Sequence, residues 1–224
     1  MFRKTSNSNR SPILWSTSRL FGFFALVMLT LGLLTTKASG QDSSAQAILK
    51  KGKVYYDNNN ITDQAAVQFS LILGKYRNSP EAESAQYYLA SYYQRKFYII
   101  KRTQGREDMR WLMTAKAEYG NYTKKYFKQG ATWLSDSFFN LALVYFQLGD
   151  SQRAGWELNK MSAYASMDPQ VYIYELVWSP DSGDVIDGYY PASQLADFMK
   201  GNAEKPFSDL INVTKRWLRV SKLK

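Results

Sequence analysis

Two pairs of carboxylates are the residues of this chain whose spacing could support catalysis. Asp181 and Asp184 lie three residues apart, and Glu81 and Glu83 lie two apart after Pro80. Paired carboxylates can divide the tasks of general acid and general base. Both pairs can be explained without catalysis. The aspartates lie in a turn sequence, where aspartate is common, and the glutamates lie where a helix should begin, where negative charge is favourable. We therefore expect no catalytic residue and classify the protein as a non-enzyme.

The residue types that the chain lacks narrow the chemistry further. It has no histidine and no cysteine. Without histidine there is no Ser-His-Asp catalysis and no His-ligated zinc. Without cysteine there is no thiolate nucleophile, no disulfide and no iron–sulfur site. No glycine-rich phosphate loop and no metal-ligand spacing is present, so we expect no cofactor and no metal.

The net charge of +10 is concentrated at the two ends of the chain. Residues 1–40 carry five basic residues and no acid, and residues 215–224 carry another five and no acid. The residues between them hold equal numbers of basic and acidic groups, which argues against a nucleic-acid-binding face. The basic C-terminal tail is a candidate for contact with an anionic membrane surface, or it only keeps the C-terminus soluble.

A second basic stretch lies in the middle of the chain, at Arg95, Lys96, Lys101, Arg102, Arg106 and Arg110. It has two interpretations. It could touch lipopolysaccharide, phospholipid or an acidic partner, or it could be an ordinary solvated surface loop.

The first forty residues have the pattern of an export signal. Residues 1–19 are polar and basic, residues 20–36 are uncharged and mostly apolar, and small residues precede Gln41. This order predicts a secretory signal peptide that is cleaved after Gly40. The alternative is an uncleaved anchor, because the apolar stretch is at the short end of what spans a bilayer. An exported chain without cysteine is typical of the bacterial periplasm.

Residues 45–166 have helical spacing almost throughout. One helix should begin at Asn78-Ser79-Pro80, with Ser79 as its side-chain cap and Pro80 in its first turn. A short motif recurs in this region, in which a small residue stands three positions before a tyrosine: Gly52 and Tyr55, Ala90 and Tyr93, Ala142 and Tyr145. The middle unit is longer than the others and has an insertion around residues 98–106.

A second motif follows each copy of the first, with a small residue at position i and large residues at i+4 and i+7. Its copies are Ala65/Phe69/Ile72, Ala115/Tyr119/Tyr122 and Ala154/Leu158/Met161. Such spacing places the three side chains of a copy on one face of a helix.

These units resemble the tetratricopeptide repeat (TPR) family, in the version found in bacterial envelopes. The family's second helix ends in a Tyr-Pro-Asn-Ser-Pro signature, which is similar to Tyr76-Arg77-Asn78-Ser79-Pro80 with Arg77 in place of the first proline. The unit from Leu141 to Met161 is the best match. The resemblance implies a solenoid of about three helical hairpins, which stack because none can bury its apolar stripe alone. It also implies that Gly52, Ala90 and Ala142 are small because the paired helix passes close.

In TPR-like solenoids the first helix of each hairpin lines the concave face. The resemblance places eight residues there: Tyr56, Tyr87, Ser91, Gln94, Arg95, Phe139, Leu143 and Phe146. We expect them to form a groove that binds a segment of a partner protein, with aromatic anchors and with Gln94 and Arg95 holding polar groups. The alternative is that the C-terminal segment folds back and packs against these rings.

Residues 168–224 do not continue the repeat. Residues 171–178 and 185–190 are rich in β-branched and aromatic residues on either side of a turn, which predicts a β-hairpin or else an irregular helix and a loop. A short helix should run from Pro191 to near Gly201, and a last helix should begin at Pro206 and pack as a solenoid cap, with a free amphipathic anchor as the alternative. The expected organisation is a signal peptide (1–40), a TPR-like repeat domain (41–166) and a C-terminal capping segment (167–224), in the all-α class.

Together these features predict a non-enzymatic adaptor or scaffold of the bacterial cell envelope, periplasmic or associated with the outer membrane, that binds protein partners. It looks similar to periplasmic TPR proteins that serve outer-membrane β-barrel assembly or the Tol–Pal system. Two alternatives are a substrate- or glycan-handling accessory module with Tyr and Trp platforms, and a scaffold tethered by an uncleaved N-terminus.

Overall fold

The computed structural model describes residues 44–58, 62–127, 130–167, 172–177 and 185–221. The chain divides into two units, Met1–Gln41 and Asp42–Lys224. The first unit lies outside the described residues, and so does the expected signal peptide. None of the described helices is both long and apolar enough to cross a membrane.

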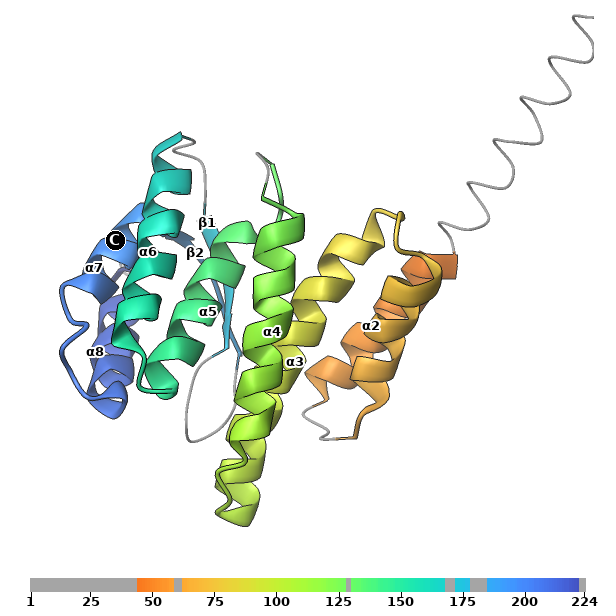
Figure 1. Ribbon diagram of the computed structural model, residues 1–224, viewed down its shortest axis with the longest axis horizontal. Helices are drawn as coiled ribbons and strands as arrows, with labels where there is room; N and C mark the ends of the chain where they lie inside the picture. The colour runs from red at the N-terminus through yellow and green to blue at the C-terminus, as the bar shows by residue number, and fades with distance from the viewer. Residues whose placement is uncertain (1–43, 59–61, 128–129, 168–171, 178–184, 222–224) are drawn as a thin grey trace, which may run out of the picture. The chain divides into compact units, whose positions relative to one another are not determined.

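Residues 44–167 are almost entirely helical, which confirms the predicted helical class. A helix over residues 44–57 is followed by α2 (Gln64–Lys75), α3 (Glu81–Gln104), α4 (Met109–Lys125), α5 (Leu134–Gln147) and α6 (Ser151–Met167). From α2 to α6, each helix packs against the next one along the chain (Figure 1). This nearest-neighbour order is the arrangement in which a row of helical hairpins buries its apolar stripes.

The second helix of each pair buries the repeated motif. Every member of the motif is fully buried: Ala65, Phe69 and Ile72 on α2; Ala115, Tyr119 and Tyr122 on α4; Ala154, Leu158 and Met161 on α6. On the first helices, Ala90 and Ala142 are buried to the same degree. We call these side chains, together with Gly52, the interhelical seam.

Gly52 shows why one position of the seam must be small. A Cβ atom on Gly52 would lie 2.6 Å from Cε1 of Phe69, which is on α2. Carbon atoms that are not bonded to each other normally stay about 3.5–4.0 Å apart. The helix over residues 44–57 therefore approaches α2 as closely as the repeat motif implies.

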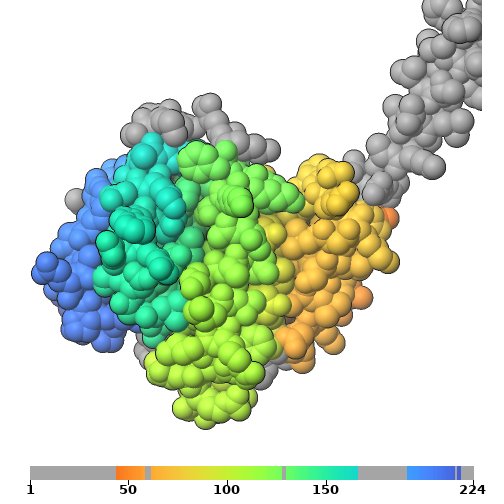
Figure 2. All heavy atoms as spheres, viewed as in Figure 1, coloured from red at the N-terminus to blue at the C-terminus, as the bar shows by residue number. Residues whose placement is uncertain are grey.

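The insertion in the middle unit is made of helix. α3 runs for 24 residues and ends where Gly105 adopts a left-handed φ of 62°. Asp108 then caps α4, because its carboxylate accepts a hydrogen bond from the backbone N–H of Arg110 at 3.3 Å. The end of α3 and the start of α4 project beyond the neighbouring helices (Figures 1 and 2).

The prediction that the side chain of Ser79 caps the start of α3 is wrong. The cap position is Pro80, whose backbone is already helical (φ −55°, ψ −32°). The hydroxyl of Ser79 has no hydrogen-bond partner among the described residues. Ser79 contributes through its backbone instead, since its carbonyl accepts from the N–H of Ala82 at 3.1 Å.

The C-terminal part contains two strands and two helices. β1 (Tyr172–Val177) and β2 (Val185–Pro191) pair as an antiparallel sheet, with Ile173 opposite Tyr190 and Val177 opposite Val185. Residues 178–184, on which the expected turn falls, lie outside the described residues. α7 (Ala192–Lys200) packs against α6, and α8 (Phe207–Ser221) packs against α7, close to the positions expected for the last two helices.

Candidate functional site

The eight residues that the sequence assigns to a groove come from three helices. Tyr56 lies on the helix over residues 44–57; Tyr87, Ser91, Gln94 and Arg95 lie on α3; Phe139, Leu143 and Phe146 lie on α5. All eight are buried, and the most exposed of them, Arg95 and Phe146, retain 7% of their accessible surface. We call this set the first-helix face.

One group of contacts in this face joins the helix over residues 44–57 to α3. The Tyr56 hydroxyl and Ser91 Oγ are hydrogen-bonded at 2.5 Å. Arg95 Nη1 donates to the backbone carbonyl of Tyr56 at 3.0 Å, and the guanidinium lies 4.8 Å from the centre of the Tyr56 ring. The Arg95 cation is thus held by a peptide oxygen and by the negative face of an aromatic ring.

Two further hydrogen bonds connect α3 to its other neighbours. The Tyr119 hydroxyl on α4 donates to Gln94 Oε1 at 2.9 Å, and Asn140 Nδ2 on α5 donates to the Tyr87 hydroxyl at 3.4 Å. Asn140 is not among the eight residues that the sequence assigns to this face. Its spacing could have found it, because Asn140 precedes Leu143 by three positions and so lies on the same side of α5.

The strand β1 lies near two of the three helices that carry the first-helix face. The backbone of β1 lies against both α5 and α3, and Figure 1 shows the strands behind α5 on the side away from α6. The backbone of the C-terminal segment thus folds back toward α5 and α3, and its packing against the rings of the face stays a prediction. All eight side chains of the face are buried, so they are interior contacts, and their role toward a partner stays a prediction.

A hydrogen-bond network next to this face fixes the start of α5. Glu83 Oε1 accepts from the Tyr122 hydroxyl at 2.7 Å and from the N–H of Thr132 at 2.7 Å. The Tyr122 hydroxyl accepts in turn from the N–H of Trp133 at 3.0 Å, and the Trp133 ring stacks on Tyr87 with centroids 4.6 Å apart. Burial and the hydrogen-bonded Glu83 carboxylate raise the pKa of Tyr122 above its usual range.

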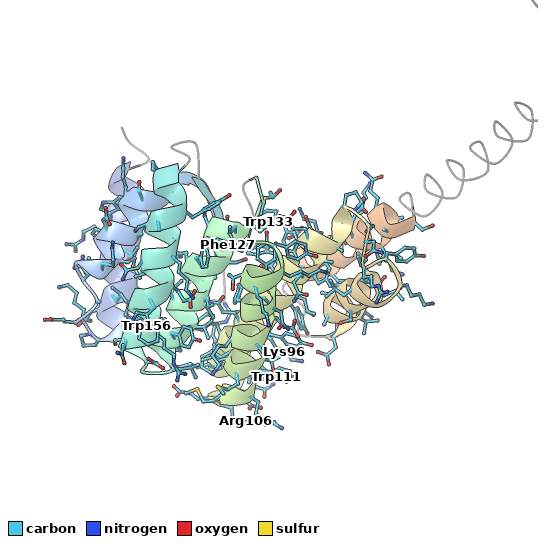
Figure 3. All side chains as sticks on the ribbon, turned by 45° about the horizontal axis from the view of Figure 1, so that its top comes forward. Lys96, Arg106, Trp111, Phe127, Trp133 and Trp156 are labelled. Atoms are coloured by element: carbon cyan, nitrogen blue, oxygen red, sulfur yellow. The ribbon has the colours of Figure 1, made fainter. Side chains whose placement is uncertain are left out.

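Lys96 lies in a second cluster, where α3 meets the starts of α2 and α4. Its ammonium group is 2.5 Å from Asp63 Oδ1 and 3.9 Å from the centre of the Trp111 ring, and Figure 3 shows Lys96 and Trp111 together. The Tyr92 hydroxyl donates to the same carboxylate at 2.9 Å. The hydrogen bond from Lys96 lowers the pKa of Asp63, so the lysine works here as a structural cation.

The remainder of the central basic stretch is largely paired with acids. Lys101 contacts Glu107 at 2.6 Å, and Asp108 contacts Arg110 at 2.7 Å and Arg106 at 3.5 Å. The two arginines hold the pKa of Asp108 at about 2, the hydrogen bonds from Arg110 contributing most. The stretch is therefore a set of local ion pairs at the projecting end of α3 and α4.

The described residues contain no group of three or more acidic side chains that could hold a metal ion. Of the carboxylate pairs considered for catalysis, Glu83 belongs to the network around Tyr122 and Trp133. Asp181 and Asp184 lie outside the described residues. The chemical groups that this region holds are aromatic rings, amides and one guanidinium.

The comparisons with known proteins give no relative from which a role could be transferred. No protein family, no curated protein and no solved structure matches this chain.

Proposed function

We propose that this protein is a non-enzymatic, TPR-like scaffold of the bacterial cell envelope that binds an extended segment of a partner protein on its first-helix face. Support for the repeat comes from the interhelical seam, in which the same register of small and large side chains is buried in three successive helix pairs. Closely spaced pairs of this kind are what a helical-hairpin solenoid requires.

The observation that carries the proposal is the position of β1. An extended segment of this chain lies against α3 and α5, two helices whose buried side chains include both rings and hydrogen-bonding groups. A surface that accepts one extended segment in cis has the shape to accept another in trans. A partner segment would bind by displacing β1, so its apparent affinity would be reduced by the fraction of molecules in which β1 is bound.

Residues 1–40 support the proposed export of the protein. Their basic start, apolar centre and small residues before Gln41 favour export with cleavage after Gly40. The intact mass of the exported protein tests this part. A chain that begins at Gln41 agrees with the proposal, and a chain that keeps residues 1–40 would instead indicate a membrane-tethered scaffold.

Site-specific photo-crosslinking in intact envelopes tests the binding role. Phe146 on the first-helix face is replaced by benzoylphenylalanine, and the matched control carries the same replacement at Trp156, an exposed residue of α6. A second version of each chain carries Ile173→Pro, which removes an N–H from β1 and weakens its pairing with β2.

We expect protein adducts from position 146, and more of them when Ile173→Pro is present, because β1 is then held less firmly near α5 and α3. The control at position 156 should not respond to Ile173→Pro. Only intramolecular products at position 146 in both versions would contradict partner binding on this face. Retention on glycan resin without any protein adduct would favour the accessory-module alternative.

A further inference from the structure

The turn end of the α3–α4 hairpin carries exposed hydrophobic side chains. We call residues 101–113, which include the end of α3 and the start of α4, the hairpin tip. Six large hydrophobic side chains are exposed among the described residues, and Met109 and Met113 are the two that lie one helical turn apart, at 39% and 48% exposure. Leu112 beside them is fully buried, so one side of α4 packs inside the fold and the methionine side is open to solvent.

The hairpin tip stands clear of the other helices. It projects beyond them in Figures 1 and 2, and Figure 3 places Arg106 at the end of the projection. A Cβ atom added to Gly105, in the turn between α3 and α4, would have no atom of the described residues within 4 Å apart from its chain neighbours. The tip is therefore a convex feature of this part of the molecule.

The exposed charge of the hairpin tip is positive. The tip contains four basic and two acidic residues. Asp108 contacts both Arg106 and Arg110, but its side chain is only 9% exposed, whereas those of the two arginines are 65% and 82% exposed. Arg102 is exposed and has no ion-pair partner among the described residues. Two positive charges are thus left without a matching acid, and the cations lie on the outside.

We propose that the hairpin tip inserts Met109 and Met113 into the headgroup region of an anionic phospholipid membrane. Binding of a protein to this layer increases with the apolar area that enters it and with the attraction of basic residues to anionic lipids. The tip supplies both contributions on one exposed surface. Methionine suits this role because its unbranched, flexible side chain adapts to irregular surroundings. The inference does not rest on the partner binding proposed for the first-helix face.

The shape of the hairpin tip favours a membrane over a protein partner. A stable protein interface buries about 800 Å² on each side, and its centre is packed as closely as a protein interior. A narrow convex end with two exposed methionines offers little area for such packing, whereas fluid lipid headgroups can surround it. The excess of cations selects anionic lipids over neutral ones.

A fluorescent probe on the hairpin tip tests the insertion directly. The chain has no cysteine, so Met113→Cys provides a single site for an environment-sensitive label such as NBD. The matched control is Asn121→Cys, at an exposed position of the same helix. It lies eight residues further on, about 12 Å along the helix axis, which exceeds the depth of about 5–10 Å reached by interfacial side chains.

The segment tested is residues 42–224. Its hydrophobic cluster extends from Tyr56 to Ile211 and forms a core of its own, so the apolar stretch at residues 20–36, a competing membrane contact, can be left out. The vesicles contain phosphatidylcholine alone or phosphatidylcholine with phosphatidylglycerol. Polyglutamate serves as the probe for an acidic protein partner.

We expect a blue shift of the label at position 113, and its quenching by spin-labelled lipid, on the anionic vesicles only. The label at position 121 should stay in water. A label at position 113 that stays in water while the chain sediments with the vesicles would place the contact elsewhere and overturn the proposal. Equal responses at the two positions, an equal response to neutral vesicles, a larger response to polyglutamate, or no binding at all would also overturn it.

Glutamine variants measure the apolar contribution by vesicle co-sedimentation. Met109→Gln combined with Met113→Gln should lower the partition coefficient about 10-fold or more, since two side chains then leave the interface. The matched control, Val54→Gln combined with Trp156→Gln, removes two similarly exposed hydrophobic side chains outside the tip and should have little effect. Equal losses in the two double variants would contradict insertion of the tip.

The electrostatic contribution is measured in the same way. Arg102→Gln should lower the partition coefficient about fivefold at low salt, and the loss should shrink as salt is added. Arg77→Gln, at an exposed arginine outside the tip, is the control. Equal losses in these two variants would show that the charge of the tip does not contribute. The labelled chains keep Met109 and every charge, so the fluorescence decides the matter even if a glutamine variant misfolds.

Discussion

The interhelical seam and the first-helix face are both buried, but different interactions determine which residues fill them. In the seam, a small side chain alternates with large apolar or aromatic ones, and the same pattern occurs in three helix pairs. In the first-helix face, polar groups such as Ser91 and Gln94 are fully buried and hydrogen-bonded. In the seam, the space available between the helices determines which side chains fit. In the first-helix face, hydrogen bonds to particular neighbours determine them.

This difference teaches why one region repeats and the other does not. Steric fit between two helices needs only the right sizes at the right spacing, so it can be copied from pair to pair. A buried amide or hydroxyl needs a partner at a defined position, so it is tied to one place in the fold. Substitutions in the two regions should therefore have effects of different sizes and different dependence on the neighbouring residue.

The largest effect is expected from Phe69→Ala in the seam. Phe69 is fully buried on α2 and meets Gly52, so its removal leaves a cavity and should lower the free energy of unfolding by about 3–5 kcal/mol. The matched control is Val67→Ala on the same helix, where the side chain is 58% exposed and the change should stay within about 0.5 kcal/mol. Urea unfolding of residues 42–224 measures both. Similar losses in the two variants would contradict the seam.

The opposite change, Ala142→Leu, tests whether the seam is also intolerant of added volume. Ala142 is fully buried on α5, which packs against α6. A leucine there should overpack the crossing and cost about 1–3 kcal/mol. Ala117→Leu, at an exposed position of α4, is the control. A melting temperature that is unchanged by Ala142→Leu would show that the repeat register is wrong.

A smaller effect is expected where the first-helix face meets the seam. Tyr119→Phe removes the hydroxyl that donates to Gln94 Oε1 and should cost about 1 kcal/mol. A double-mutant cycle with Gln94→Leu isolates the pair, and the expected coupling energy is about 0.5–1.5 kcal/mol. Additive losses would mean that this hydrogen bond does not specify the face, and the contrast with the seam would be weakened.

The smallest effect concerns the ion pair of α3 with the start of α2. The hydrogen bond from Lys96 lowers the pKa of Asp63 in the folded state. A group with a lowered folded pKa stabilises the protein above its unfolded pKa, about 3.9 for aspartate, and loses this contribution as the pH falls through the folded value. The Asp63 side chain is 64% exposed, so screening limits the contribution to roughly 0.5 kcal/mol or less.

Asp63→Asn should therefore lower the free energy of unfolding slightly near neutral pH, and the difference from the unchanged chain should disappear in acid. Chemical denaturation at several pH values measures it. Asp57→Asn, at an exposed aspartate without an ion pair among the described residues, is the control. A difference between Asp63→Asn and the unchanged chain that grows as the pH falls would have the wrong sign and would contradict the assigned cause.

Much of the helical part could be read from the sequence, because its information is local. The spacing of Ala154, Leu158 and Met161 predicts one buried helix face, and these three side chains are fully buried. The turn at Gly149-Asp150 is likewise marked by residue type, and Gly149 adopts a left-handed φ of 78°. Such positions depend on neighbours within a few residues of the chain.

Other features could not be predicted, because they depend on segments far apart in the sequence. The sequence of the insertion around residues 98–106 does not indicate whether it forms a longer helix or a loop. In the structure α3 packs against α4 and stays helical as far as Gln104. Asn140 joins the first-helix face through Tyr87, which is 53 positions away. Ser79 has the type and spacing of a helix cap, but the helical backbone at Pro80 shifts the helix start.

The sequence by itself determined the helical class, the register of the seam, the neutral body with two basic ends and the absence of histidine and cysteine chemistry. These follow from residue type and short-range spacing. Only the tertiary structure decided that β1 lies against α3 and α5, and that Glu107 and Asp108 form ion pairs with Lys101, Arg106 and Arg110. The physical reason is that apolar periodicity tells which side of a helix is buried, whereas the segment that covers it is selected by shape and hydrogen bonding across the whole fold.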